Sequence, residues 1–408
     1  MHSKNVADRT RLAEIDLQLT SQPEECAASV ALQIERIFVK ERLDAYKYPV
    51  ATLPNEIVSE IFIHFLPPYP LCPPLVGPFS PTHLTHICRH WRDIALSTPK
   101  LWRAMNLYQR MTIISPDLPD VWAHRARTLP LSIRMIGHDT KTAKRLLAAV
   151  FRYKARWEYI HLEVRATSSR LPPVEGSMPL LRQLYLNSGP IRTSHLNFSS
   201  APKLQTVIMD FNVAHDSKLI LPFAQLRTLG LMWMDLSVAR KFLAAAAANL
   251  VECELDISPE LEGTRMDVIS LPRVEHLRLN DVHENGEIGD CLQYFELQNL
   301  RCLDVAEVFM GNNPVDSLQK LIERSNGCPH LHTVCVRTRL MADYLFRQAF
   351  PKIEFLFDDN SDGDRDGPYC WKDIEDEIDY TSGDETWYDE FWHEMWVSDQ
   401  ERTKRIQS

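Results

Sequence analysis

The sequence predicts a multidomain α+β protein in which a helical region is followed by a stack of short α/β repeats. Two observations predict this class. In the first hundred residues, apolar residues recur at the three- and four-residue steps of a helix. From about residue 155 onward, a short template of apolar positions recurs at intervals of about 22 to 31 residues. The chain divides accordingly into residues 1–46, 47–110, 111–357 and 358–408.

Residues 1–46 are expected to form one or two amphipathic helices, separated near Pro23, which suits a helix start. One interpretation is a short coiled coil that dimerises the protein. The other, which the sequence favours, is a helix that packs against the protein's own second region, because a sustained coiled coil needs three or four heptads. The apolar residues at helical spacing are Leu12, Ile15, Leu19, Val30, Ile34 and Ile37.

Residues 53–102 carry the densest pattern in the chain. Pro54 suits the first turn of a helix, and Pro99 would end a second helix that contains Trp91. Two short helices cannot bury both Trp91 and Trp102 within themselves, so a third element or a partner must cover them. The other residues of the pattern are Leu53, Glu56, Ile57, Ile61, Phe62, Cys88, Arg89, Arg92, Ile94, Ala95 and Leu101.

This stretch resembles an F-box, whose pattern is a Leu-Pro opening, an Ile-Phe pair, a Cys-Arg-x-Trp-Arg-x-Ile-Ala helix and a Pro-x-Leu-Trp exit. It departs from the family in the proline-rich insert 67–81, where a plain F-box has a short turn. We expect this insert to be an exposed, semi-extended loop. A ligand for a small proline-recognition domain is a less favoured interpretation. An ordinary helical hairpin is the alternative to the F-box itself.

The template of the third region is an apolar residue, two variable residues, an apolar residue, one variable residue and a last apolar residue. Leu181-x-x-Leu184-x-Leu186 and Leu226-x-x-Leu229-x-Leu231 are clear copies, and copies run from Trp157 to Ile353. The template resembles leucine-rich repeats, in degenerate form. The last two apolar positions alternate on a short strand and would point into a shared core, which neighbouring repeats must complete. The alternative is an unrelated α/β domain with parallel strands and crossover helices.

The resemblance to leucine-rich repeats implies a solenoid whose concave face carries the variable outward residues. That face would hold a protein substrate. The residues expected there are Arg182, Tyr185, Gln205, Thr228, Glu254, His276, Arg278, Cys302 and His332.

The fourth region, 358–408, is acidic and rich in tryptophan. About 17 acidic residues stand between Asp358 and Glu401, so the rest of the chain is close to neutral although the net charge is -10. A basic nucleic-acid face is therefore not expected. The run from Asp358 to Gly367 lacks the closing Glu of a calcium loop and is interpreted as a solvated acidic linker. An amphipathic segment around Trp392 would cap the repeats or dock a partner.

Other chemistry finds little support in the sequence. No secretory signal and no membrane-spanning run is predicted, and the nine cysteines, an odd number, favour reduced thiols in the cytoplasm or nucleus. No phosphate-binding loop or nucleophile elbow is found, so we expect neither catalysis nor a cofactor. Two groups of potential metal ligands are not expected to bind a metal. The spacing of Cys328, His330, His332 and Cys335 is not that of a zinc site, and among His83, His86, Cys88 and His90 the cysteine already has a packing role beside Trp91.

The F-box resemblance implies the function. The chain would be the substrate-recognition subunit of an SCF-type cullin-RING ubiquitin ligase, with a Skp-type adaptor and, through it, a cullin as partners. Its contribution would be proximity, and it would make no bonds itself. The alternative is a non-catalytic repeat scaffold that acts outside a ubiquitin ligase. The residues that the resemblance assigns to the adaptor surface are Leu53, Pro54, Ile57, Ile61, Phe62, Trp91, Ile94, Leu101 and Trp102.

Overall fold

The computed structural model describes most of the chain from its first helix to residue 358. Within this part, no helix has the length and apolar character needed to cross a membrane. The acidic region that follows, including the predicted linker and the tryptophan-rich segment, lies outside the described residues. The described residues are 2–21, 27–44, 53–108, 115, 117–138, 141–165, 173–188, 195–216, 219–258, 267–281, 289–337 and 341–358.

The first region forms two helices, α1 (His2–Ser21) and α2 (Ala27–Asp44), which confirms the helical prediction. The two helices run antiparallel, because residues near the start of α1 pair with residues near the end of α2. Ile15 and Val39 are buried between them. Three ion pairs connect the helices: Arg11–Glu35, Arg36–Asp16 and Arg42–Asp8.

The second region contains three helices and a 3-10 turn, one helix more than the sequence predicted. The additional helix is α4, which the sequence analysis missed because it is only seven residues long. Its start is defined by Ser80, whose hydroxyl accepts a hydrogen bond from the Thr82 amide, and by Pro81 in the first turn. The elements are α3 (Asn55–Phe65), α4 (Pro81–Ile87), α5 (Arg89–Ser97) and η2 (Pro99–Trp102).

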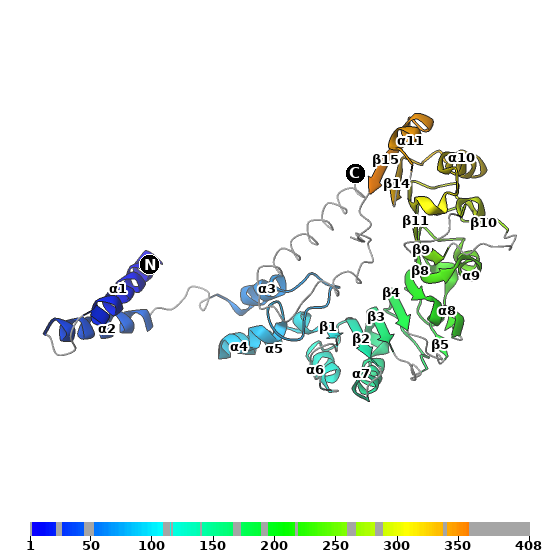
Figure 1. The fold of residues 1–408 in the computed structure, drawn as a ribbon. Coiled ribbons are helices and arrows are strands. Elements are labelled where there is room, and N and C mark those ends of the chain that lie inside the picture. Colours follow the sequence, from blue (N-terminus) through cyan, green and yellow to red (C-terminus); the bar gives the residue numbers. More distant parts are fainter. Residues whose placement is uncertain are drawn as a thin grey trace.

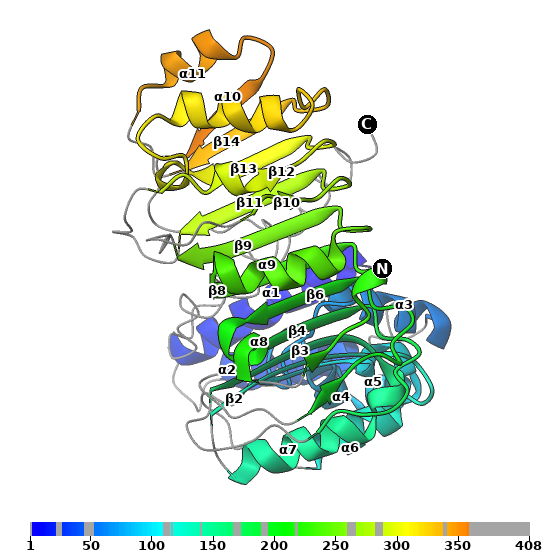
Figure 2. The ribbon, with the colours of Figure 1, turned by 90° about the vertical axis from the view of Figure 1, so that its right-hand side faces the viewer.

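The rest of the described chain is organised around an 11-stranded parallel sheet in which the strand order follows the order along the chain. Between the two edge strands, each strand pairs with the preceding and the following strand of the sheet, and Figure 2 shows these inner strands side by side. The strands are β1 (Ala104–Tyr108), β2 (Leu131–His138), β3 (Trp157–Arg165), β4 (Gln183–Ser188), β6 (Thr206–Asp210), β8 (Thr228–Asp235), β9 (Glu252–Ser258), β11 (His276–Asp281), β13 (Cys302–Ala306), β14 (Thr333–Arg337) and β15 (Glu354–Asp358).

The strands line the inner side of an arc, and the connecting helices lie on its outer side (Figure 1). Two short parallel ladders also connect neighbouring units, β5 (Leu196–Asn197) with β7 (Leu219–Ile220) and β10 (Ile269–Ser270) with β12 (Phe295–Glu296). The connecting helices are α6 (Leu118–Arg125), α7 (Lys141–Arg152), α8 (Phe211–Asp216), α9 (Leu236–Ala246), α10 (Pro314–Arg324) and α11 (Asp343–Ala349), with 3-10 turns η3 (Lys154–Arg156), η4 (Phe223–Gln225), η5 (Leu292–Tyr294) and η6 (Glu307–Phe309).

The register of the sheet aligns the repeated template from strand to strand. Leu184 pairs with Val207, and Val207 pairs with Leu229, so equivalent template positions form a row across the strands. All three side chains are fully buried, on the side that the helices cover. Because successive residues of a strand point to opposite faces, the residues between these core positions form the opposite face. We call this face, on the inner side of the arc, the inner face.

The sheet begins earlier than the sequence predicted. The boundary placed between residues 110 and 111 falls after β1, whose residue Ala104 pairs with Ser132 of β2. The template could not reveal β1, because this strand follows η2 almost directly and carries no complete copy. By contrast, the apolar residues of 131–135 alternate as a strand requires, in agreement with β2, and those of 141–153 recur at helical spacing, in agreement with α7.

The proline-rich insert is not an exposed loop. It packs on the inner face at the first strands, where the Tyr69 hydroxyl donates to Glu158 (2.8 Å) and the Ser132 hydroxyl donates to the Pro70 carbonyl (2.6 Å). Cys72 is buried, with its sulfur 3.4 Å from the Ser132 hydroxyl. The prediction failed because the side chains between the prolines supply the packing, and proline content alone does not reveal it. The insert thus attaches the helical region to the sheet.

Candidate functional site

Helix α3 has one apolar face in the core and a second apolar face on the surface. Val58 and Phe62 are buried, whereas Ile57 and Ile61 are 49% and 45% exposed. The helix begins directly after Pro54, whose carbonyl accepts from the amides of Ile57 and Val58 (both 3.1 Å). Two exposed isoleucines one turn apart can insert together into a partner's apolar groove.

Of the residues that the sequence assigned to the adaptor surface, five are accessible. Leu53 and Trp91 are half-buried, and Pro54, Ile57 and Ile61 are exposed. We call these five residues the α3 surface. Trp91 packs edge-on against Phe62 with ring centroids 4.9 Å apart, so it also supports the helix behind the surface.

The other four, Phe62, Ile94, Leu101 and Trp102, are in the core and are corrected here to structural residues. Trp102 shows the reason most clearly. Its indole N–H donates to the Ala95 carbonyl (2.8 Å), and its ring packs edge-on against Trp122 of α6. The helical pattern marked both faces of these helices as apolar and gave no means of deciding which face the sheet would cover.

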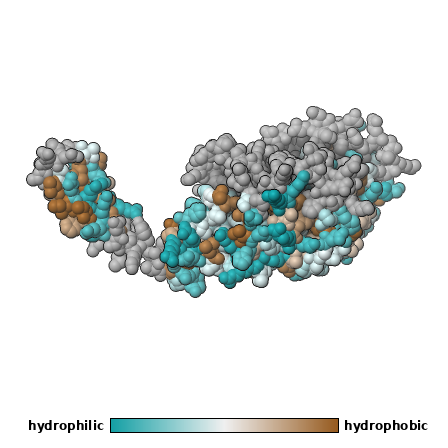
Figure 3. All heavy atoms as spheres, turned by 90° about the horizontal axis from the view of Figure 1, so that it is seen from below, coloured by the Kyte–Doolittle hydropathy of each residue, from teal (hydrophilic) through white to brown (hydrophobic). Residues whose placement is uncertain are grey.

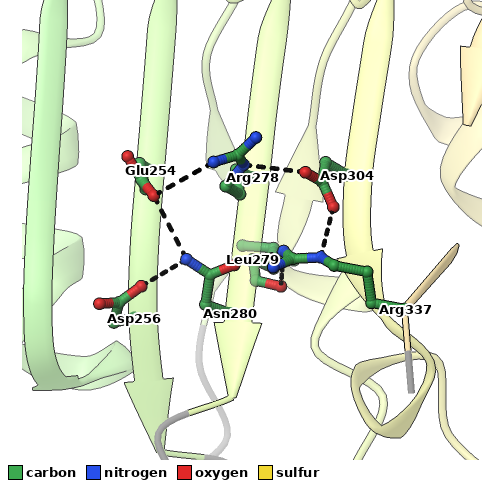
Figure 4. Close-up of polar contacts among 7 residues, drawn as sticks. All are labelled: Glu254, Asp256, Arg278, Leu279, Asn280, Asp304 and Arg337. Carbon is green, nitrogen blue, oxygen red and sulfur yellow. Dashed lines mark hydrogen bonds and ion pairs between the residues drawn. The ribbon is translucent and has the colours of Figure 1, made fainter. Parts of the chain in front are cut away.

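The inner face carries a polar network across β9, β11, β13 and β14 (Figure 4). Asp304 stands at its centre and accepts from Nε of Arg278 (2.8 Å) and from Nε of Arg337 (2.7 Å). Arg278 also lies 3.7 Å from Glu254. All four side chains are mostly buried but remain accessible to solvent.

Asn280 connects the two halves of this network. Its side-chain amide donates to Asp256 (2.6 Å) and to Glu254 (3.3 Å), and its oxygen accepts from Arg337. Arg337 further donates to the Leu279 carbonyl. The inner-face network, as we name it, therefore consists of Glu254, Asp256, Arg278, Asn280, Asp304 and Arg337.

Burial and neighbouring charges shift the pKa values of Glu254 and Arg278 in opposite directions. Burial raises the pKa of Glu254, and Arg278 lowers it again only in part. Burial also opposes the charged form of Arg278, but Asp304 and Glu254 more than offset this, so the pKa of Arg278 is raised. The network thus places two guanidinium groups among three carboxyl groups. Such a preorganised set of donors and acceptors suits recognition of a polar or charged peptide segment.

Of the residues predicted to bind a substrate, Glu254 and Arg278 belong to the network. Tyr185 is buried and stacks on His161 at 4.0 Å, and Thr228 is buried and bonds to Glu252 (3.3 Å). Cys302 borders the network, because it lies two residues before Asp304 on β13 and the charges of Asp304 and Arg278 both act on its thiol. The remaining predicted residues are surface-accessible and do not belong to the network: Arg182, Gln205, His276 and His332.

Sequence reasoning missed Asp256, Asn280, Asp304 and Arg337. A signal for them existed in the template. Asp304 occupies the variable position between the two core residues Leu303 and Val305, as Arg278 does in the preceding repeat. The other three directly follow the last apolar position of their copies, so they belong to the next row of the same face.

An open pocket of about 530 Å³ lies where the helical region meets α6 and η3. Two of the arginines that line it, Arg125 and Arg156, have structural roles. Arg156 donates to the carbonyls of Ala123 and Leu129 at the end of α6, and Arg125 stacks over Trp102 at 4.3 Å. The contact of Arg125 with Trp102 of η2 thus connects the helical region to α6, and Arg156 connects α6 to η3. In the described part of the chain, no group of three His, Cys, Asp or Glu side chains is arranged to hold a metal ion.

Comparison of the chain with known proteins gives no match to a family model and no match to a curated protein.

Proposed function

We propose that the chain is the substrate-recognition subunit of an SCF-type cullin-RING ubiquitin ligase. The F-box-like helical region would dock a Skp-type adaptor through the α3 surface, and the repeats would bind the target protein through the inner face. The observation that carries the proposal is the pair Ile57 and Ile61, which are exposed directly after the Leu53-Pro54 opening while the other side of α3 is buried. In a chain that folds alone, such a pair would have little reason to be apolar.

The proposal includes a leucine-rich-repeat-like solenoid for the sheet. Two features support it. The strand order equals the chain order, with parallel pairing throughout, as stacked repeats require. The template positions Leu184, Val207 and Leu229 also align in register and are buried, so each unit completes its core against its neighbours. An exposed inner face that contains a preorganised polar network is then the surface available to a target.

Capture of the Skp-type adaptor by the full chain tests the first half of the proposal. We expect the double variant Ile57→Glu with Ile61→Glu to lose adaptor binding by a factor on the order of 1,000, because apolar anchors cost roughly 2 kcal/mol each when removed and every 1.4 kcal/mol is tenfold in affinity. Neither side chain contributes to the core, so the unfolding midpoint should stay near that of the wild type.

A matched control is Ile220→Glu, which places the same charge on an isoleucine of similar exposure (42%) in the short β7 ladder. This variant should capture the adaptor as the wild type does. Equal capture by wild type and double variant would rule out the α3 surface as the docking site. If the adaptor is captured but a cullin never accompanies it, the scaffold function outside a ligase becomes the better conclusion.

A further inference from the structure

Helix α2 has two apolar faces, and α1 covers one of them. The covered face contains the buried Val39, and its flanks carry Glu35 and Arg42, which pair with α1. The opposite face consists of Val30, Ile34, Ile37 and Phe38, which are 50%, 50%, 56% and 57% exposed. Their spacing of four, three and one residues places them in one stripe along the helix. Figure 3 shows apolar surface gathered on this helix pair.

The size of this stripe fits a weak but specific interface. Four half-exposed side chains offer roughly 400 Å² per copy, and with the flanking polar side chains a pair of copies would bury about 1,000 Å² in total, the lower limit for a specific interface. Isolated apolar residues on a surface are ordinary, whereas a contiguous stripe of large side chains marks an interaction site.

When a second copy of the stripe lies antiparallel to the first, the large side chains of one copy face the small side chains of the other. In an antiparallel pair centred on Ile34, Phe38 of one copy faces Val30 and the small Ala31 of the other. A parallel pair would instead set Phe38 against Phe38 and leave Ala31 against Ala31. The large end of the stripe therefore fits the small end of a second copy only in the antiparallel arrangement.

The charge at the end of the stripe favours the same arrangement. Glu41 is exposed and lies one turn beyond Ile37. In the antiparallel pair it meets the N-terminal end of the second α2, where the helix dipole stabilises a carboxylate. In a parallel pair, the two Glu41 side chains would face and repel each other.

We propose that two copies of the chain associate through this face of α2, antiparallel about a two-fold axis near Ile34, and so form a row of four helices with the two α1 helices on the outside. This association is independent of the proposed ligase function, because it uses neither the α3 surface nor the inner face. Its consequence is that a single assembly carries two copies of each of those surfaces.

The test is sedimentation equilibrium of the full-length chain. The wild type should dimerise with a dissociation constant in the micromolar range, about 1 to 50 µM, as expected for an interface of this size. The double variant Ile34→Glu with Phe38→Glu should stay monomeric up to about 100 µM, because it places four charges in the apolar seam. The control Gln33→Glu adds the same charge at an exposed flank of the stripe and should dimerise as the wild type does.

Two results would overturn the dimer: a wild type that is monomeric at 100 µM, or a double variant that dimerises as strongly as the wild type. Circular dichroism of each variant establishes that the helices still form. The orientation has its own test in Glu41→Lys, which sets a cation against the helix N-terminus of the partner copy. We expect the dissociation constant to rise by about three- to tenfold. An unchanged constant would overturn the antiparallel arrangement.

Discussion

The two ends of the inner face differ in what covers them. Over β2 and β3, the proline-rich insert occupies the face and places Tyr69 and Cys72 against Glu158 and Ser132. Over β9 to β14, the inner-face network remains partly open to solvent, centred on Asp304. The same strand geometry thus serves attachment at one end and offers a binding surface at the other. The difference depends on which side chains occupy the alternate positions of each strand.

Loss of the insert contact should have the largest effect on stability. Tyr69 packs edge-on against Tyr159, lies under the Arg103 guanidinium at 3.4 Å and donates to Glu158. We expect Tyr69→Ala to lower the free energy of unfolding by about 3 kcal/mol, as measured by urea denaturation. Tyr69→Phe keeps the ring and should cost only about 1 kcal/mol. Equal small losses in both variants would mean that the insert contributes little to the attachment.

Disruption of the network centre should have a smaller effect on stability and a clear effect on binding. Asp304→Asn offers one acceptor where two guanidinium groups now donate, so we expect a loss of about 1 to 2 kcal/mol in the free energy of unfolding. Proteins retained by the wild type through the inner face should be lost from affinity purifications of this variant.

Glu275→Gln is the matched control, since it removes a half-exposed partner of Arg301 and should change stability by less than about 0.5 kcal/mol. If Asp304→Asn retains the same proteins as this control, target binding does not use the network.

The smallest effect is expected at Glu254, and it should depend on pH. Because burial raises its pKa in the folded state above the ordinary value of 4.5, the folded protein binds this proton more tightly than the unfolded chain does. The wild type therefore loses stability relative to Glu254→Gln as pH rises through the folded-state pKa. The difference should be near zero below pH 4.5 and reach less than about 1 kcal/mol at neutral pH. Thermal unfolding of both proteins from pH 4 to pH 8 measures it, and a difference independent of pH would contradict the assignment.

The sequence predicted the part of the fold that repeats. Leu184, Leu229 and their equivalents occupy fixed template positions, and a period is visible without any knowledge of the tertiary structure. It did not predict β1 or the position of the insert, because these depend on contacts with strands distant in sequence, such as Tyr69 with Glu158.

The candidate surfaces were predicted only in part, because they too depend on contacts between parts of the chain that are distant in sequence. Helical spacing identified Ile57 and Phe62 together, but one is exposed and the other is buried. Which face of α3 turns outward follows from where the sheet and α5 lie, and local periodicity does not contain that information. Of the network residues, the sequence identified Glu254 and Arg278, because each occupies the variable position between two apolar residues of the template. Asp304 was missed although it occupies the equivalent position.

Because every strand of the sheet pairs with its neighbours in chain order, equivalent side chains of the inner face are separated by a fixed distance from strand to strand. Glu254, Arg278 and Asp304 occupy one row on three successive strands, at intervals of about 4.8 Å. Gain or loss of one strand with its connecting segment between them would shift the spacing of their charges by one such interval, because each strand pairs only with its direct neighbours. Selectivity for a target could therefore change in discrete steps along this row, while the helical region and its attachment stay as they are.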